Sequence, residues 1–185
     1  MDTFLLTMML VFAIALGGRE QRVVAQFSDA VGRSTPLLLT AIGCAVASAC
    51  VMGWAGWSLA ALLPDRAADM LVAIALAIAA FELGWAVKLK PMKEPTRSFV
   101  AIAAVLFVRQ LGDAARFVVF AYAAQAVYPV TSMIGGALGG AAAVGLGWMA
   151  GLERLERVPL RAIRMAMAFA LIVAALLIGM NARLS

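Results

Sequence analysis

Two short polar stretches interrupt apolar segments of this chain, and their side chains have the chemistry to bind a solute. The second polar segment, residues 107–117, carries four such residues: Arg109, Gln110, Asp113 and Arg116. The first polar segment, residues 12–22, is a weaker copy that carries Arg19, Glu20, Gln21 and Arg22. An ionisable side chain near the centre of a bilayer costs at least ~2.5–3.5 kcal/mol, so it rarely lies there without a partner. The two polar segments are therefore the candidate functional site.

Oxygen atoms are the metal ligands that these segments offer. The chain contains no histidine, which removes the commonest transition-metal ligand. Hard cations such as Ca2+ and Mn2+ prefer several oxygen ligands, usually with carboxylates among them. The predicted metal ligands are Asp113, Glu20, Gln110 and Gln21.

Arginines in the same segments oppose cation binding. The segments hold four of them against two carboxylates, a net charge of +2 (four minus two). On a continuous helix Arg109, Asp113 and Arg116 share one face, at spacings of four and three residues. We therefore expect Asp113 to be held between two arginines, and Glu20 to contact Arg109 or Arg116. The arginines, Arg19 and Arg22 included, belong either to a transport path or to a buried charge network.

The composition is typical of a membrane protein. Of the 185 residues, 65% are hydrophobic, against about 45–50% in an ordinary soluble domain. The net charge of +5 is better explained by basic cytoplasmic loops than by nucleic-acid binding. We predict an all-α integral membrane protein, a single membrane domain over residues 1–185 with membrane lipids as partners. Nothing in the sequence indicates an enzyme or a cofactor, and the sequence is compatible with a homo-oligomer.

Six apolar segments are long enough to cross a bilayer, since a span needs ~20 residues. Their approximate bounds are 4–32, 35–62, 66–88, 98–127, 130–151 and 159–182. The first and fourth segments are the longest and contain the polar segments. They are expected either to tilt with polar faces inward or to break at Gly17-Gly18 and Gly112. Irregular backbone at membrane depth needs cover from protein or a water-filled cavity.

Loop charges predict the orientation in the membrane. Basic residues concentrate after the first, third and fifth segments: Arg33, Lys88, Lys90, Lys93, Arg97, Arg154, Arg157, Arg161 and Arg164. The opposite side carries only Arg66 and Arg183. Because cytoplasmic loops are enriched in Lys and Arg, both termini are predicted on the non-cytoplasmic side. Glu82 is expected to reach toward the cytoplasmic surface beside Lys88.

Residues 4–88 are weakly repeated in residues 98–182. The matches keep their order: Leu16-Gly17 with Leu111-Gly112, Val23-Val24 with Val118-Val119, Pro36 with Pro129, Gly43 with Gly136, and Gly53-Trp54 with Gly147-Trp148. Each half holds three spans, an odd number, so the halves must insert in opposite orientations. Such a 3+3 inverted repeat is typical of secondary transporters, whose site lies near the membrane midplane. An ancient duplication without transport is the alternative.

With these features the chain resembles the Gdt-type cation/proton exchangers, six-helix proteins built from two inverted halves. Each half of that family carries a Glu-x-Gly-Asp-Lys-Thr-Gln signature in its first helix. In the second half of this chain Gln110 stands at the Glu position, Gly112 and Asp113 match, and residues 114–116 differ. In the first half Ala15 and Gly18 replace the two acids, and Glu20 lies two positions further on.

Three functional hypotheses follow. The resemblance implies a divergent exchanger of Mn2+ or Ca2+ for H+ in a bacterial inner membrane, with exchange weakened by the lost carboxylates. The same scaffold could instead carry an anionic or neutral solute through Arg109 and Arg116, because guanidinium groups bind carboxylate and phosphate. The third hypothesis is a non-transporting membrane protein whose charges form a structural network.

Overall fold

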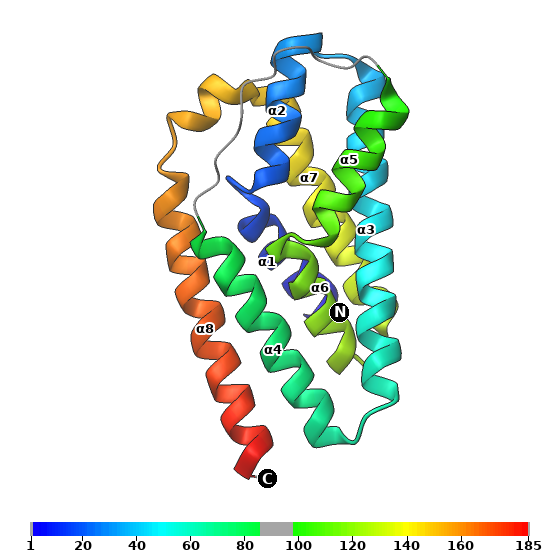
Figure 1. The fold of residues 1–185 in the computed structure, drawn as a ribbon, viewed down its shortest axis with the longest axis vertical. Coiled ribbons are helices and arrows are strands. Elements are labelled where there is room, and N and C mark those ends of the chain that lie inside the picture. Colours follow the sequence, from blue (N-terminus) through cyan, green and yellow to red (C-terminus); the bar gives the residue numbers. More distant parts are fainter. Residues whose placement is uncertain (1, 86–97, 185) are drawn as a thin grey trace.

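The computed structural model describes residues 2–85 and 98–184, and the regular structure in these residues is entirely α-helical. The described residues form eight helices (Figure 1): α1 (Asp2–Ala15), α2 (Arg19–Val31), α3 (Thr35–Ala61), α4 (Asp65–Gly84), α5 (Phe99–Leu111), α6 (Ala114–Gln125), α7 (Pro129–Glu156) and α8 (Leu160–Leu184). The predicted all-α class is confirmed. The C-terminal end of the third predicted segment, residues 86–88, and the basic residues of 88–97 lie outside the described residues.

The first and fourth predicted segments are broken helices. The chain bends by 61° between α1 and α2, where Gly17 takes a φ of +69° that only glycine adopts readily. The break between α5 and α6 falls at Gly112 and Asp113. Of the two expected arrangements, the break at both glycine positions is therefore the one found. Both breaks lie near the middle of the long dimension of the bundle (Figure 1).

Four of the described helices are long and apolar enough to cross a membrane: α3, α4, α7 and α8. A fifth span is reached if the bent pair α1–α2 counts as one crossing, and α5 is a shorter apolar helix. The outer faces of the long helices expose large apolar side chains, including Leu39, Trp54, Phe81, Phe169 and Leu176. Several long apolar helices with apolar outer faces indicate a membrane protein.

The direction of the chain reverses between its two halves. In Figure 1, α1 and α2 run upward, α3 runs downward and α4 runs upward again. The second half follows the opposite series, with α5 and α6 downward, α7 upward and α8 downward. The two halves thus pass through the molecule in the same order of elements but with opposite directions.

The broken pair α1–α2 packs along α7 in the same direction. Gly139 lies against the backbone of Met8, where an added Cβ would overlap the peptide oxygen. Further along both elements, the Oγ of Ser28 donates a hydrogen bond of 2.9 Å to the carbonyl of Trp148. Glycine in α7 therefore lets the backbone of the broken helix approach closely.

The broken pair α5–α6 packs along α3 in a matching way, again in the same direction. Near the start of α5, Cys44 Sγ donates a hydrogen bond of 3.4 Å to the carbonyl of Ala103. In the middle of α6, the carbonyl of Phe120 lies against Gly56 of α3 and leaves no room for a Cβ there. Each broken pair is therefore covered by the long glycine-containing helix of the other half.

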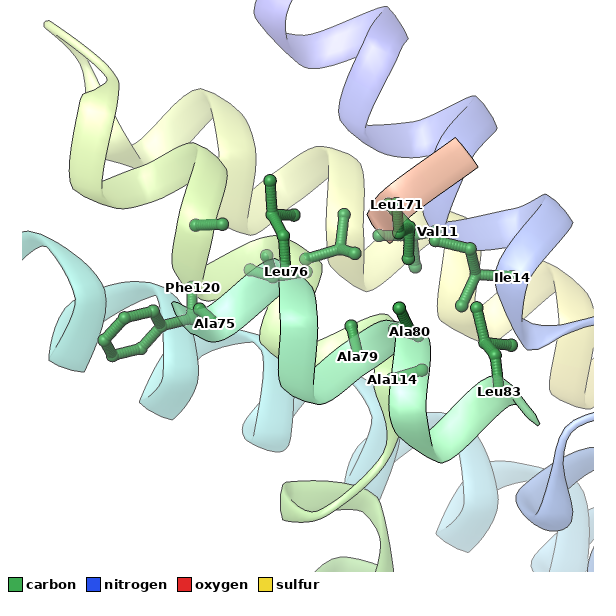
Figure 2. Close-up of a cluster of buried hydrophobic side chains, with 14 of the residues drawn as sticks. Val11, Ile14, Ala75, Leu76, Ala79, Ala80, Leu83, Ala114, Phe120 and Leu171 are labelled. Atoms are coloured by element: carbon green, nitrogen blue, oxygen red, sulfur yellow. The ribbon is translucent and has the colours of Figure 1, made fainter. Parts of the chain in front are cut away.

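The remaining long contacts are antiparallel. In the pair α3–α7, Gly53 lies close to Met133, near the end of one helix and the start of the other. In the pair α4–α8, Ala73 lies 3.5 Å from a Cβ added at Gly179, while Glu82 approaches Arg164. Figure 2 shows the apolar core beside this pair, where Leu83 of α4 faces Ile14 of α1 and lies near Ala114 of α6.

The predicted fifth segment ends at 151, and α7 indeed kinks there. Gly151 has a φ of +71° and interrupts the helical dihedrals, although α7 continues to Glu156. The backbone N–H of Leu152 then donates a hydrogen bond of 2.8 Å to the carboxylate of Asp29. The carboxylate at the end of α2 thus caps the last turn of α7.

Replacing Gly139 with alanine is expected to destabilise the protein by roughly 1–3 kcal/mol, because the added Cβ overlaps the α1 backbone. Gly145→Ala in the same helix is the matched control, since nothing lies within 4 Å of its added Cβ. The free energy of unfolding of this control should stay the same or rise by up to about 1 kcal/mol, because alanine has a higher helix propensity than glycine. Unfolding of the purified protein in mixed detergent micelles measures both changes, and equal stabilities would contradict the packing.

Candidate functional site

Buried polar side chains gather where the two broken helices meet. Residues from both polar segments and from α3 have exposed fractions of 6% or less: Glu20, Gln21, Ser48, Gln110, Asp113 and Arg116. Glu20 lies in the first turn of α2, and Asp113 is the residue that precedes α6. The structure therefore encloses Glu20, Gln21, Gln110, Asp113 and Arg116 of the two polar segments, and their role as a functional site stays a prediction.

Arg116 is the most deeply buried charged side chain in the described residues, with an exposed fraction of 0%. Its Nε donates a hydrogen bond of 2.7 Å to Ser48 Oγ. That hydroxyl lies 3.0 Å from Gln110 Oε1, which can accept its proton. Arg116, Ser48 and Gln110 thus link α6, α3 and α5 across the second break.

The two terminal nitrogens of Arg116, Nη1 and Nη2, have no hydrogen-bond acceptor among the described residues. Both lie 2.9 Å from the position of a Cβ added at Gly140. A side chain at this position of α7 would therefore displace the guanidinium group. A buried cation with unfilled donor positions is costly, so this end of Arg116 is available to an incoming acceptor.

Three carboxylates act on one another around this arginine. The charges of Asp113, Arg116 and Glu82 all act on Glu20, while those of Glu82, Arg116 and Arg164 act on Asp113. Within the described residues neither Glu20 nor Asp113 forms a direct ion pair, and Glu20 Oε1 has no hydrogen-bond donor. The carboxylates of both breaks are thus close enough to interact but incompletely paired.

Glu82 and Arg164 belong to this charge cluster, and sequence reasoning missed that role. Their side chains approach to 3.5 Å and are 15% and 6% exposed, and Arg164 Nη2 also donates to the carbonyl of Glu82 at 3.2 Å. From the sequence, Glu82 is expected to reach toward the cytoplasmic surface beside Lys88, but it pairs with Arg164 instead, because antiparallel packing of α4 and α8 brings this arginine close. Lys88 lies outside the described residues. The opposite charges near the facing ends of two apolar segments were the available signal.

The predicted clamp of Asp113 between two arginines is also wrong. The helix ends at Leu111, so Arg109 and Arg116 do not share a face, and Arg109 is exposed. Glu20 makes no direct ion pair with Arg109 or Arg116 in the described residues. Arg19 is exposed and Arg22 half-buried, which removes most of the predicted positive excess.

With every side chain counted as ionised, the formal charge of the enclosed cluster is negative. The cluster contains Glu20, Glu82 and Asp113 against Arg116 and Arg164, which gives −1 (two minus three). The value of +2 from the polar segments alone counted arginines that lie outside the cluster and omitted Glu82 and Arg164. The negative formal charge of the enclosed cluster favours binding of a cation.

The two glutamines already have protein partners. Gln21 Oε1 accepts from the N–H of Gly17 at 2.7 Å, and its Nε2 donates to the carbonyl of Ala143 at 2.9 Å. Gln110 Oε1 faces Ser48. In the part of the chain that the structure describes, no group of three Cys, Asp or Glu side chains has the spacing to hold a metal ion. Metal coordination by Asp113, Glu20, Gln110 and Gln21 stays a prediction.

Comparison of the chain with models of known protein families, with curated proteins and with solved structures found no match. The functional inference therefore depends on the packing and charges of the site.

Ser48→Ala is expected to destabilise the protein by about 1–3 kcal/mol, since it leaves the buried Nε of Arg116 without its acceptor. Ser58→Ala, at a half-buried position of the same helix, removes the same hydroxyl group away from the cluster. Its expected effect is within about 0.5 kcal/mol. Unfolding by sodium dodecyl sulfate titration compares the two, and equal losses would show that the Ser48–Arg116 bond does not stabilise the fold.

Proposed function

We propose that this protein is a secondary transporter that exchanges a divalent cation, Mn2+ or Ca2+, for protons across a bacterial inner membrane. One observation carries the proposal: two broken helices meet at a buried cluster of incompletely paired carboxylates. Discontinuous helices that meet near the midplane are the usual architecture of a secondary-transport site. This cluster is the proposed binding site, and Glu20 and Asp113 are its proposed ligands.

The proposed architecture is six spans in a 3+3 inverted repeat, with α1–α2 and α5–α6 each forming one broken span. When each half is superposed on the other, the packing of α1–α2 on α7 corresponds to that of α5–α6 on α3. In both cases the broken pair runs in the same direction as the long helix against which it packs. The same superposition maps the pair α3–α7 onto itself and the pair α4–α8 onto itself, and the helices of each pair are antiparallel. These relations are expected of a two-fold axis perpendicular to the helices and support the repeat.

Corresponding side chains at the two breaks support it further. Gln21 and Arg116 each occupy the third position after the residue that precedes their helix, Gly18 and Asp113. Gln21 reaches α7 at Ala143, and Arg116 reaches α3 at Ser48. A neutral amide and a cation therefore occupy equivalent positions, and of these two positions only that of Arg116 carries a positive charge.

Carboxylates give the cluster the chemistry of proton exchange. A carboxylate loses its charge when it binds a proton, so protons and a metal cation compete for the same oxygens. The net charge of −1 and the unpaired Glu20 oxygen supply attraction for a cation. Arg116 opposes it, because a buried guanidinium already compensates part of the negative charge. Exchange is therefore expected to be weak.

Transport of an anionic solute is the second candidate, favoured by the two Arg116 nitrogens without an acceptor. The predicted partner Arg109 is exposed and lies outside the enclosed cluster, so Arg116 would act with the N-terminus of α6 instead. If the protein transports neither kind of solute, the remaining hypothesis is that the charges form a purely structural network.

The orientation is tested by cysteine labelling in a variant without Cys44 and Cys50. A cysteine at Leu62, which is 80% exposed between α3 and α4, should react with an impermeant maleimide in intact cells. A cysteine at the exposed Arg154 should react only after permeabilisation, because basic segments lie in the cytoplasm. Reaction of both positions from outside would remove the predicted topology.

The exchange activity is tested in proteoliposomes with an imposed pH gradient and Mn2+ or Ca2+ outside. The expected result is slow cation uptake that Asp113→Asn lowers by about tenfold or more, equal to ~1.4 kcal/mol or more of lost binding. Asp65→Asn, which removes an exposed carboxylate at the start of α4, should leave uptake unchanged.

The strength of exchange is tested by restoring acids at Ala15, Gly18 and Gln110. Gln110→Glu preserves shape, whereas a Cβ at Gly18 lies 2.9 Å from the Ala15 carbonyl, so the single variant is measured beside the triple one. Restored acids should raise uptake. Strong uptake by the unmodified protein would contradict the inhibitory role of Arg116. If neither the unmodified protein nor the variants take up the cation, the proposal of cation transport is contradicted.

A further inference from the structure

A second charged site adjoins the carboxylate cluster, with which it shares Arg164, and lies between α2, the end of α4 and the start of α8. It is a cavity of about 190 Å3 whose lining includes Arg22, Leu83, Trp85, Arg161, Arg164 and Met165. Three arginines from two helices thus face one small space, and the described lining contains no acidic side chain. The functional proposal does not use this cavity.

The arginines have donor positions to spare. Arg164 is 95% buried, with an exposed fraction of 5%, and its Nη1 has no hydrogen-bond acceptor among the described residues. The buried Nε of Arg22 also has none within the same residues. Buried donors left unfilled are destabilising, typically by about 1–3 kcal/mol each and more when charged. Both residues line the cavity, so each brings to it a side chain with an unfilled donor.

The positive charge of the cavity is only partly neutralised. The carboxylates that act on Arg164 are Glu82, at 3.5 Å, and Asp113. Arg22 and Arg161 have no carboxylate partner in the described part of the chain. Guanidinium groups bind phosphate oxygens through paired, charge-assisted hydrogen bonds, which suits two or three arginines around one anion.

The rim of the cavity is apolar and open. Trp85 and Met165 line it with exposed fractions of 60% and 50%. In the proposed topology this end of α4 and α8 is cytoplasmic, where tryptophan favours the membrane interface. Basic pockets between transmembrane helices on that side bind phosphate-bearing lipid headgroups.

We propose that Arg22, Arg161 and Arg164 form a binding site for a phosphate group. The anion is the headgroup phosphate of an anionic lipid or a free phosphate, since both present the same oxygens to the guanidinium groups. The membrane placement of the site rests on the proposed function, but phosphate binding does not. A binding assay therefore separates failure of this proposal from failure of transport.

The experiment uses the full-length protein in a neutral detergent. Short-chain phosphatidylglycerol, phosphatidylcholine and inorganic phosphate are titrated separately, with bound lipid counted by native mass spectrometry and phosphate binding measured by calorimetry. Arg22→Gln with Arg161→Gln should weaken binding by about tenfold or more, as loss of charge-assisted hydrogen bonds predicts. Arg33→Gln with Arg154→Gln, two exposed arginines outside the cavity, changes the net charge equally and should alter it by less than about twofold.

Each outcome decides the proposal. Tight phosphatidylglycerol binding that inorganic phosphate displaces identifies a lipid headgroup site, while phosphate binding without lipid binding identifies a free anion. Arg161→Gln alone, at an exposed position, serves if the double variant does not fold, and it should weaken binding about threefold. Absence of binding by every probe at millimolar concentration, or equal losses in cavity and control variants, would overturn the proposal.

Discussion

A helix can be interrupted inside a membrane only where protein covers the backbone groups that the interruption frees. The rest of this structure depends on that constraint, because two of its helix pairs are broken near the middle of the bundle. Close approach of the long helices provides the cover, and Gly139 and Gly56 permit it by having no side chain. The same cover encloses Glu20, Asp113 and Arg116 at the breaks, so the packing also determines the electrostatics of the site.

Much of the fold could be predicted because its signals are local and strong. Apolar runs of about span length gave the positions of the helices, and Gly17 and Gly112 marked the breaks. The kink at Gly151 fell at the predicted end of an apolar segment. These features depend on hydropathy and on backbone freedom, both of which are properties of short stretches of sequence.

The site could be predicted only in part, because its composition depends on which helices pack together. Of the residues in the two polar segments, Glu20, Asp113 and Arg116 are charged and buried together. Glu82 and Arg164 entered this group through antiparallel packing that no local pattern reveals. Arg109 left it because the break rotates the following helix, which spacing rules for a continuous helix do not include. The sign of the net charge changed as a result.

The cover of each break by the other half also has a consequence for synthesis. Gln21 and Ser28 bond to residues 122 and 120 positions later in the chain. While the ribosome makes the chain, α1 and α2 therefore wait until α7 has emerged before their polar groups find native partners. During that interval Glu20 must be sheltered by the insertion machinery or by water at the membrane surface, as an uncovered charge in lipid is costly. Until the second half has been made, the first half therefore lacks these native hydrogen-bond partners.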